Sequence, residues 1–147
     1  MIDKKFLSKK KGPKSDNRKL VEKLDTVFSE FIRLRDSDEH GICRCITSGE
    51  FFHWRDVDAG HFITRDNMAT RFEEKNVNAQ GRKDNRFLSG KQFEHGQAID
   101  RKHGAGTAEF LLHKSKSPCQ FQDFELEAMI SYYKNEVKEL KAEKGML

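Results

Sequence analysis

The sequence lacks a long apolar segment. No uninterrupted apolar run approaches the roughly 18 residues that a membrane-spanning helix needs, and the lysine-rich N-terminus is not followed by the apolar stretch of a secretory signal. Cysteine is also scarce. There are three cysteines, an odd number, and Cys43 and Cys45 are too close in sequence to bridge easily, which argues against a disulfide scaffold. We therefore expect a soluble cytoplasmic protein with no membrane partner.

Core-forming residues are few as well. Hydrophobic residues make up 35% of the 147-residue chain and charged residues another 35%, which leaves limited material for a core. Twelve phenylalanines, one tryptophan and several periodic apolar stretches nevertheless exclude a fully disordered chain. The length favours one domain, because two would be cramped. We predict a flexible basic arm over residues 1–14 and a single domain over residues 15–147.

Positive charge is concentrated at the N-terminus. Residues 1–19 hold eight Lys and Arg against two Asp, a net charge of +6, so the rest of the chain contributes −2 to the total of +4. A basic arm strengthens binding to a polyanion through counterion release, whereas a solvated, frayed terminus is the alternative. A second group of cations favours nucleic acid as the partner. This group comprises Arg65, Arg71, Lys75, Arg82, Lys83, Arg86 and Lys91.

Apolar periodicity predicts helices at both ends of the domain. Ser15 or Asp16 can cap a helix that runs to about Asp36. Its apolar face comprises Leu20, Leu24, Val27, Phe28, Phe31 and Leu34. A last helix over about 123–143 has a comparable stripe, which we interpret as core, with a dimer seam as the alternative.

The middle of the chain has a different character. Residues 42–63 alternate in the manner of short strands, and the turn signal at 47–50 predicts a hairpin. Residues 64–84 read as a polar, irregular loop, and a globular protein seldom keeps so polar a loop without a function. Helical patterns resume over about 85–102 and 107–114. Together these elements predict an α+β fold.

This middle region also holds the residue types of a metal-dependent nuclease. Such an enzyme needs hard ligands for a divalent ion, a neutral imidazole to deprotonate water, and an amide that orients the imidazole. Asp58 and Asn85 offer oxygen ligands suited to Mg²⁺ or Mn²⁺, and His61 lies on the predicted hairpin in position for the base. Asn76 or Asn78 could fix the imidazole ring.

Other polar residues in the region have simpler interpretations. Arg71 has the planar fork that clamps a phosphate. Asp84 is expected to cap the helix that begins at Asn85. The remaining histidines of the predicted helices show no pairing at metal-ligand spacing, so we assign them to the surface or to helix packing. They are His95, His103 and His113.

Several short blocks of the chain carry a family resemblance. The blocks are Arg44-Cys45-Ile46-Thr47-Ser48-Gly49, Asp58-Ala59-Gly60-His61-Phe62-Ile63, Ala69-Thr70-Arg71-Phe72, Asn76-Val77-Asn78-Ala79-Gln80, Asn85-Arg86-Phe87 with Ser89-Gly90, and Gly104-Ala105-Gly106. In order and spacing they resemble the phage recombination protein NinG (Rap) family over about residues 20–140, and the layout is similar to phage endonuclease VII. The resemblance implies a small ββα-metal (HNH-like) core between an N-terminal helix and C-terminal helices.

The same resemblance implies an activity. It points to a Mg²⁺- or Mn²⁺-dependent endonuclease that cuts branched recombination intermediates, such as Holliday junctions and D-loops, by phosphodiester hydrolysis. His61 is the expected base, Asp58 and Asn85 the metal ligands, Asn76 the residue that orients the His61 ring or the hairpin, and Arg71 the phosphate clamp. The expected DNA contacts are Arg65, Lys75, Arg82, Lys83, Arg86 and Lys91. Because resolving a four-way junction needs two paired cuts, we expect a homodimer on branched double-stranded DNA, in the host cytoplasm.

The chain departs from the family in its cysteines. The family has Cys-x-x-Cys in the first block and Cys-x-x-Cys-Asn in the second, whereas this sequence keeps only Cys45; the other positions are Ser48, Gly81 and Asp84. Because a closed zinc site of this kind needs four thiolates, we predict no structural zinc. The two flanking helices and an aromatic cluster are expected to replace the lost binding energy. The cluster comprises Phe51, Phe52, Trp54, Phe62, Phe72 and Phe87.

Alternatives remain for the thiols and for the activity. A metal site rebuilt from Cys43, Cys45, His40, His53 or Cys119 competes with free buried thiols in a reducing compartment. The retained metal-site residues favour an active, zinc-free nuclease. A non-catalytic DNA-binding recombination accessory protein is the main competing function, and an HNH nuclease that cuts plain duplex is the third.

Overall fold

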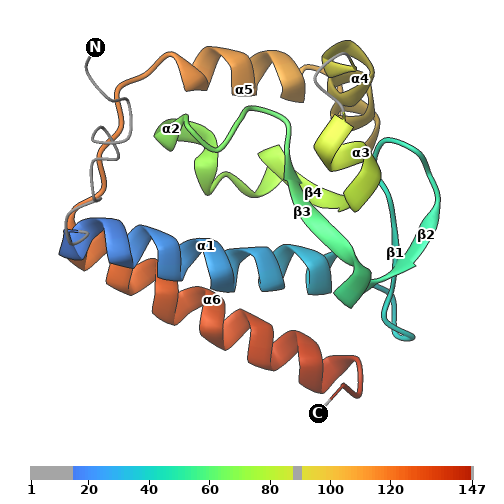
Figure 1. Cartoon of the computed structure of the whole chain (residues 1–147), viewed down its shortest axis with the longest axis horizontal. Coiled ribbons are helices and arrows are strands. Elements are labelled where there is room, and N and C mark those ends of the chain that lie inside the picture. Colours follow the sequence, from blue (N-terminus) through green and yellow to red (C-terminus); the bar gives the residue numbers. More distant parts are fainter. Residues whose placement is uncertain (1–14, 88–90, 147) are drawn as a thin grey trace, which may run out of the picture.

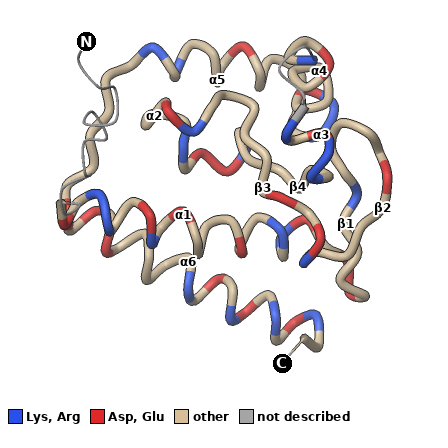
Figure 2. Tube along the Cα trace, viewed as in Figure 1, with Lys and Arg blue, Asp and Glu red and all other residues tan. Residues whose placement is uncertain are grey.

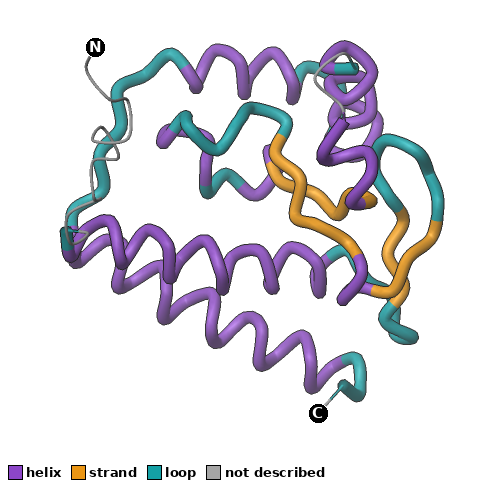
Figure 3. The backbone as a smooth tube through the Cα atoms, viewed as in Figure 1, coloured by secondary structure: helices purple, strands orange, loops and turns teal. Residues whose placement is uncertain are grey.

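The computed structural model describes residues 15–87 and 91–146, with the side chain of Phe87 excepted. In these ranges the chain forms six α-helices and two antiparallel sheets of two strands each, so the predicted α+β class is confirmed (Figure 1). The strands β3 (Val57–His61) and β4 (Val77–Gly81) lie between two pairs of helices (Figure 3). One pair is α1 (Asp16–Arg35) with α6 (Asp123–Glu143), and the other is α4 (Gln92–His103) with α5 (Thr107–Ser115). The predicted arm over residues 1–14 and the Ser89-Gly90 block lie outside the described residues. Among the described helices, none has the length and apolarity to span a bilayer.

Two long helices form one side of the molecule. Helix α1 (Asp16–Arg35) and helix α6 (Asp123–Glu143) lie side by side (Figure 1). They run in the same direction, because Asn17 donates to the carboxylate of the first residue of α6 at 2.8 Å, while at the other end Lys144 donates to the Leu34 carbonyl. The α1 cap is the predicted one, since the Ser15 hydroxyl accepts the hydrogen bond of a first-turn amide.

The main hydrophobic core lies between these helices and the β3–β4 sheet. Its members from the two helices include Leu24, Phe28, Phe31, Ile32, Leu126, Ile130 and Tyr133. The rings of Phe28 and Tyr133 meet edge to face with their centroids 4.9 Å apart. Burying each such side chain contributes roughly 1.5–3 kcal/mol. The stripe of the last helix is therefore core, as predicted.

The strands form two hairpins. Strand β1 (Ile42–Arg44) pairs with β2 (Phe51–His53), which confirms the hairpin predicted around residues 47–50. Strand β3 (Val57–His61) pairs with β4 (Val77–Gly81), and helix α3 (Arg82–Phe87) follows β4 directly. The chain thus folds into two antiparallel strands and a helix in the region of the predicted site.

The prediction of an irregular loop over residues 64–84 is wrong. Helix α2 (Met68–Arg71), strand β4 and the start of α3 all lie inside it. The polar side chains of Asn78 and Gln80 concealed the strand, because both are buried and make their hydrogen bonds inside the protein. Val77 and Ala79 do alternate with these two residues, but the run is short, and the polar side chains indicated an exposed segment although they are buried.

Two further helices cover the other side of the β3–β4 hairpin. The helix predicted over about 85–102 is in fact two elements, α3 and α4 (Gln92–His103), and α5 (Thr107–Ser115) follows. A small second core joins them to the end of β3 and contains Phe62, Ile99 and Leu111. The assignment of the helical histidines to packing or surface is consistent with their places: His95 packs against the Phe62 ring, His103 contacts Asn78 and His113 is exposed.

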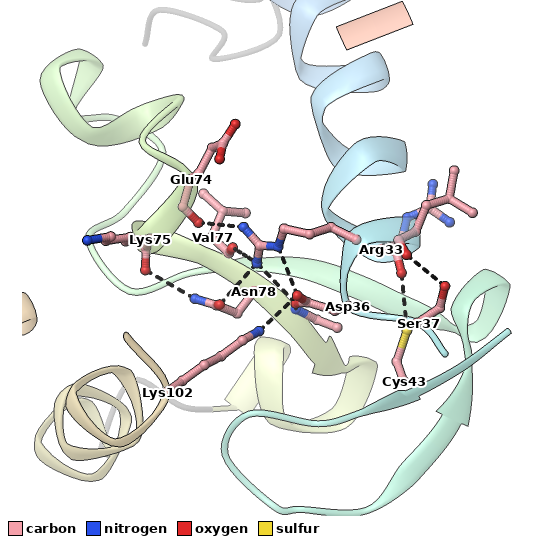
Figure 4. Close-up of polar contacts among 12 residues, drawn as sticks. Arg33, Asp36, Ser37, Cys43, Glu74, Lys75, Val77, Asn78 and Lys102 are labelled. Carbon is pink, nitrogen blue, oxygen red and sulfur yellow. Dashed lines mark hydrogen bonds and ion pairs between the residues drawn. The ribbon is translucent and has the colours of Figure 1, made fainter. Parts of the chain in front are cut away.

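A buried carboxylate fastens α1, β4 and α4 together. Asp36 accepts hydrogen bonds from the Arg35 guanidinium at 2.9 Å and from the Ala79 amide at 2.8 Å, and Lys102 reaches it from α4 at 2.9 Å (Figure 4). Burial acts to raise the pKa of Asp36, but these donors and charges outweigh burial and leave the pKa below its ordinary value. Arg35 also donates to the carbonyl of Val77 at 2.9 Å. The position of β4 is therefore fixed from both sides.

Candidate metal centre and nucleic-acid interface

The unit formed by β3, β4 and α3 brings the three predicted metal-site residues to one cavity. Asp58 and His61 come from β3 and Asn85 comes from α3, and all three line a cavity of about 670 Å³. Helix α1 forms the opposite wall through Asp25 and Arg33. Asp58 and Asn85, which are 27 positions apart in the chain, therefore line the same cavity as His61.

Asp58 and Asn85 are direct neighbours. The Asn85 amide donates to one oxygen of the Asp58 carboxylate at 3.0 Å, and the Arg82 Nε lies 3.8 Å from the other oxygen. A carboxylate and an amide oxygen suit a hard divalent cation that keeps several waters or takes phosphate oxygens as its remaining ligands. Among the described residues there is no group of three or more His, Cys, Asp and Glu that could hold a metal, so a cation here would have few protein ligands. This donor set fits Mg²⁺ or Mn²⁺ and does not fit a closed zinc site.

The His61 ring is held by a backbone carbonyl. Its Nε2 lies 3.0 Å from the Arg71 carbonyl oxygen, and because a carbonyl only accepts, Nε2 carries the proton. In the neutral ring Nδ1 is then the free acceptor. Burial lowers the pKa of His61 below its ordinary value, and the hydrogen bond to Arg71 only partly offsets this effect. The ring is therefore neutral at pH 7, which is the form that can accept a proton.

Asn76 holds the loop that follows β3. Its side chain is fully buried; Oδ1 accepts from the Ile63 amide at 2.8 Å, and Nδ2 donates to the carbonyls of Ile63 and Thr70 at 3.0 Å each. Thr70 precedes the residue whose carbonyl binds the His61 ring. Asn76 thus fixes the loop that presents this carbonyl. Of the two roles expected for Asn76, orienting the His61 ring or orienting the hairpin, its contacts resemble the second. The other candidate, Asn78, accepts from Arg35 at 3.1 Å on the far side of β4.

The structure places Arg71 differently from the prediction. Its guanidinium forms a two-point ion pair with Asp25 on α1, with Nε 2.9 Å from Oδ1, and its Nη1 donates to the Arg65 carbonyl at 3.1 Å. The donors that would clamp a phosphate are thus engaged within the protein. The partner could not be found from sequence, because Asp25 belongs to a helix 46 positions earlier.

Other arginines provide the cationic lining of the cavity. Of the six predicted DNA contacts, Arg65 and Arg82 line it. The other four are exposed outside the lining, and they are Lys75, Lys83, Arg86 and Lys91. Sequence reasoning missed Arg33 and Arg55, whose guanidinium carbons lie 5.4 and 5.1 Å from the centre of the Trp54 ring. The sequence offered one signal for Arg55, which is that it directly follows Trp54.

The four positions that carry the family's cysteines, of which only Cys45 keeps its thiol, also come together. The Cys45 Sγ accepts hydrogen bonds from the amides of Gly81 at 3.2 Å and Ser48 at 3.5 Å, while Thr47 donates to Asp84 at 2.7 Å. Burial acts to raise the pKa of Cys45, but the donors around the sulfur lower it overall. One thiol, one carboxylate and hydroxyl groups do not fit a four-thiolate zinc site, and Gly81 has no side chain to offer. Hydrogen bonds join the two segments at these positions.

The alternative rebuilt site finds no support in the geometry of the described residues. Cys43 is buried and its thiol donates to the Arg33 carbonyl at 3.2 Å. His53 accepts from the Arg55 amide at 3.2 Å through Nδ1. Of the predicted aromatic cluster, Phe52, Trp54 and Phe72 pack on the main core. Phe62 belongs to the second core, Phe51 is 70% exposed and the Phe87 side chain lies outside the described part.

Comparison with known proteins identifies the family. A family model described as the bacteriophage lambda NinG protein matches residues 2–143. This chain belongs to the NinG family. The family resemblance drawn from the sequence blocks is thereby confirmed, and NinG membership indicates a function connected with phage recombination. Searches of curated proteins and of solved structures find no significant match.

Proposed function

We propose that this NinG-family protein is a metal-dependent endonuclease that cuts branched recombination intermediates. The observation that carries the proposal is the convergence of His61, Asp58 and Asn85 on one cavity. The order of two antiparallel strands and a helix that positions them is the order of a ββα-metal (HNH-type) core. Family membership supports recombination DNA as the substrate class.

His61 is the base in the proposed mechanism. Its Nε2 proton is held by the Arg71 carbonyl, so Nδ1 can take a proton from the attacking water. The lowered pKa keeps the ring ready to accept that proton at neutral pH. Asn76 acts through the loop that carries this carbonyl and is a positioning residue.

Asp58 and the amide oxygen of Asn85 would hold Mg²⁺ or Mn²⁺, which when bound supplies charge neutralisation at the reacting phosphate and the leaving oxygen. To accept the cation, Asp58 must exchange its contacts with the Asn85 amide and with Arg82. Arg82 is half exposed and can turn toward a phosphate instead. Arg65, on the loop after β3, lines the same cavity as a second phosphate contact.

Cleavage of four-way junction DNA by a His61→Ala variant tests the proposal. General base catalysis contributes roughly 10²–10⁴ to the rate, so we expect cleavage to fall by at least about 100-fold while junction binding persists. His113→Ala, which removes an exposed histidine of α5, is the matched control and should cleave normally. EDTA should abolish nicking by the unaltered protein. Cleavage by His61→Ala at the unaltered rate would remove His61 from the mechanism.

A non-catalytic recombination accessory protein is the second candidate. One observation favours it: Asp58 already has a hydrogen bond from Asn85 and a cation, Arg82, beside it. Binding of branched DNA with no EDTA-sensitive nicks, in Mg²⁺ and in Mn²⁺, would decide for this candidate.

A further inference from the structure

A second cavity lies on a part of the surface that the proposed catalytic site does not use. It has a volume of about 830 Å³ and lies between the turn after β1, the end of α1 and helix α4. Its charged lining comprises Arg35, Asp36, Arg44, Arg101 and Lys102. It shares no lining residue with the cavity of Asp58 and His61.

The charges of this cavity are not balanced. Its single acidic residue, Asp36, is buried and is shared by Arg35 and Lys102, each 2.9 Å away. Among the described residues, Arg44 donates only to the Gly49 carbonyl, at 3.3 Å, and lies over the Phe51 ring. Arg101 is exposed and has no acidic partner in the same part of the chain. Two arginines on facing walls are therefore available to an anion.

The other walls of the cavity also suit an anionic backbone. The turn after β1 adds Ser48 to the lining, and a serine hydroxyl can donate a hydrogen bond to an anion. Figure 2 shows basic residues of β1, α3 and α4 at the same end of the molecule. Arginine side chains and hydroxyl groups are usual contacts to DNA phosphates, and they fix position without reading sequence.

We propose that this cavity binds backbone phosphates of a second duplex arm of the branched DNA whose first arm lies in the cavity of Asp58 and His61. The inference rests on the proposed function, which supplies DNA as the ligand. Two basic cavities that share no lining residue give a physical reason for preferring a branch, because a branch offers a separate arm to each, and we expect a linear duplex in the first cavity to leave the second without a ligand. Arg44 and Arg101 are the residues that would contact the second arm.

Binding measurements with a double variant, Arg44→Ala with Arg101→Ala, test this inference. The probes are a fluorescent four-way junction and a linear duplex of one arm, titrated in EDTA so that no cutting occurs. Each phosphate contact contributes about 0.9 to the slope of log affinity against log salt. At 0.15 M salt, relative to 1 M salt, this slope corresponds to about fivefold in affinity for each contact. We expect the junction slope to fall by up to about 2 and junction affinity by tenfold or more, whereas the linear duplex loses much less.

Matched variants separate this inference from general electrostatics. Lys134→Ala with Lys138→Ala removes the same charge from exposed positions of α6 and should leave junction binding nearly unchanged. Arg44→Lys with Arg101→Lys should restore most of the binding. Equal losses in the α6 variant, equal losses on linear and branched DNA, or no change on the junction would each overturn the second-arm site. If the unaltered protein binds and cuts junctions while the double variant is unaffected, only this inference fails; if the unaltered protein binds no DNA, the proposed function fails with it.

Discussion

Acidification should destabilise this protein through one buried histidine. His95 is 2% exposed, packs edge to face on Phe62, and its Nε2 has no hydrogen-bond partner among the described residues. Burial lowers the pKa of His95 to about 4, from an ordinary value of 6.5. The folded state therefore resists protonation, whereas the unfolded chain takes up a proton below about pH 6.5.

The sign and the size of the effect follow from this difference in pKa. Stability is fully present above pH 6.5 and is lost as the pH falls toward 4, because the unfolded state binds more protons in that window. Each pKa unit corresponds to about 1.4 kcal/mol, so the total is at most about 3 kcal/mol, of which about 2 kcal/mol is lost between pH 7 and pH 5. Burial likewise lowers the pKa of His103 to about 4, but that side chain is partly exposed, so solvent reduces its share.

Urea denaturation followed by circular dichroism at pH 7, 6 and 5 measures this loss. A His95→Leu variant keeps an apolar side chain in place and should lose about 2 kcal/mol less than the unaltered protein between pH 7 and pH 5. His113→Ala, at an exposed position, should lose stability like the unaltered protein. The reasoning is refuted if the His95→Leu variant and the unaltered protein show the same dependence on pH.

Three further predictions concern the cavity of Asp58. Asn76→Ala removes three hydrogen bonds and should lower the free energy of unfolding by roughly 2–4 kcal/mol, measured by denaturation. Cleavage should also fall under conditions in which the variant is folded. A stable, fully active variant would contradict the positioning role of Asn76. Arg82→Ala removes the cation beside Asp58 and should lower the Mn²⁺ concentration needed for half-maximal binding, measured by calorimetry. An unchanged or higher concentration would show that Arg82 does not compete with the metal ion for Asp58. Arg71→Ala and Asp25→Ala should each destabilise the protein, and the double variant should cost less than the sum of the two; additive losses would indicate that the pair is not coupled.

The sequence predicts those parts of the fold in which side-chain chemistry and position agree. The apolar faces of α1 and α6 repeat at helical spacing, and the Ser15 cap and the 47–50 turn carry local signals. The convergence of Asp58, His61 and Asn85 came from motif order rather than from periodicity, because no local pattern states that β3 and α3 meet.

The remaining features depend on long-range contacts. Strand β4 was missed because Asn78 and Gln80 are polar yet fully buried, and their partners come from other segments. Arg71 has a fork suited to phosphate, but α1 supplies Asp25 as its partner instead. The carbonyl that orients His61 is likewise invisible in a sequence, since every residue has one.

The last turns of α1 join the two cavities physically. Arg33 lines the cavity of Asp58, and Arg35, two residues later, lines the second one. The contacts of Asp36 with β4 and α4 hold the end of α1, so the helical segment from Arg33 to Arg35 keeps its geometry. Two anionic ligands bound at the same time would therefore be kept at a set spacing and angle by the protein, and a deformable DNA branch would have to adjust its arms to that geometry.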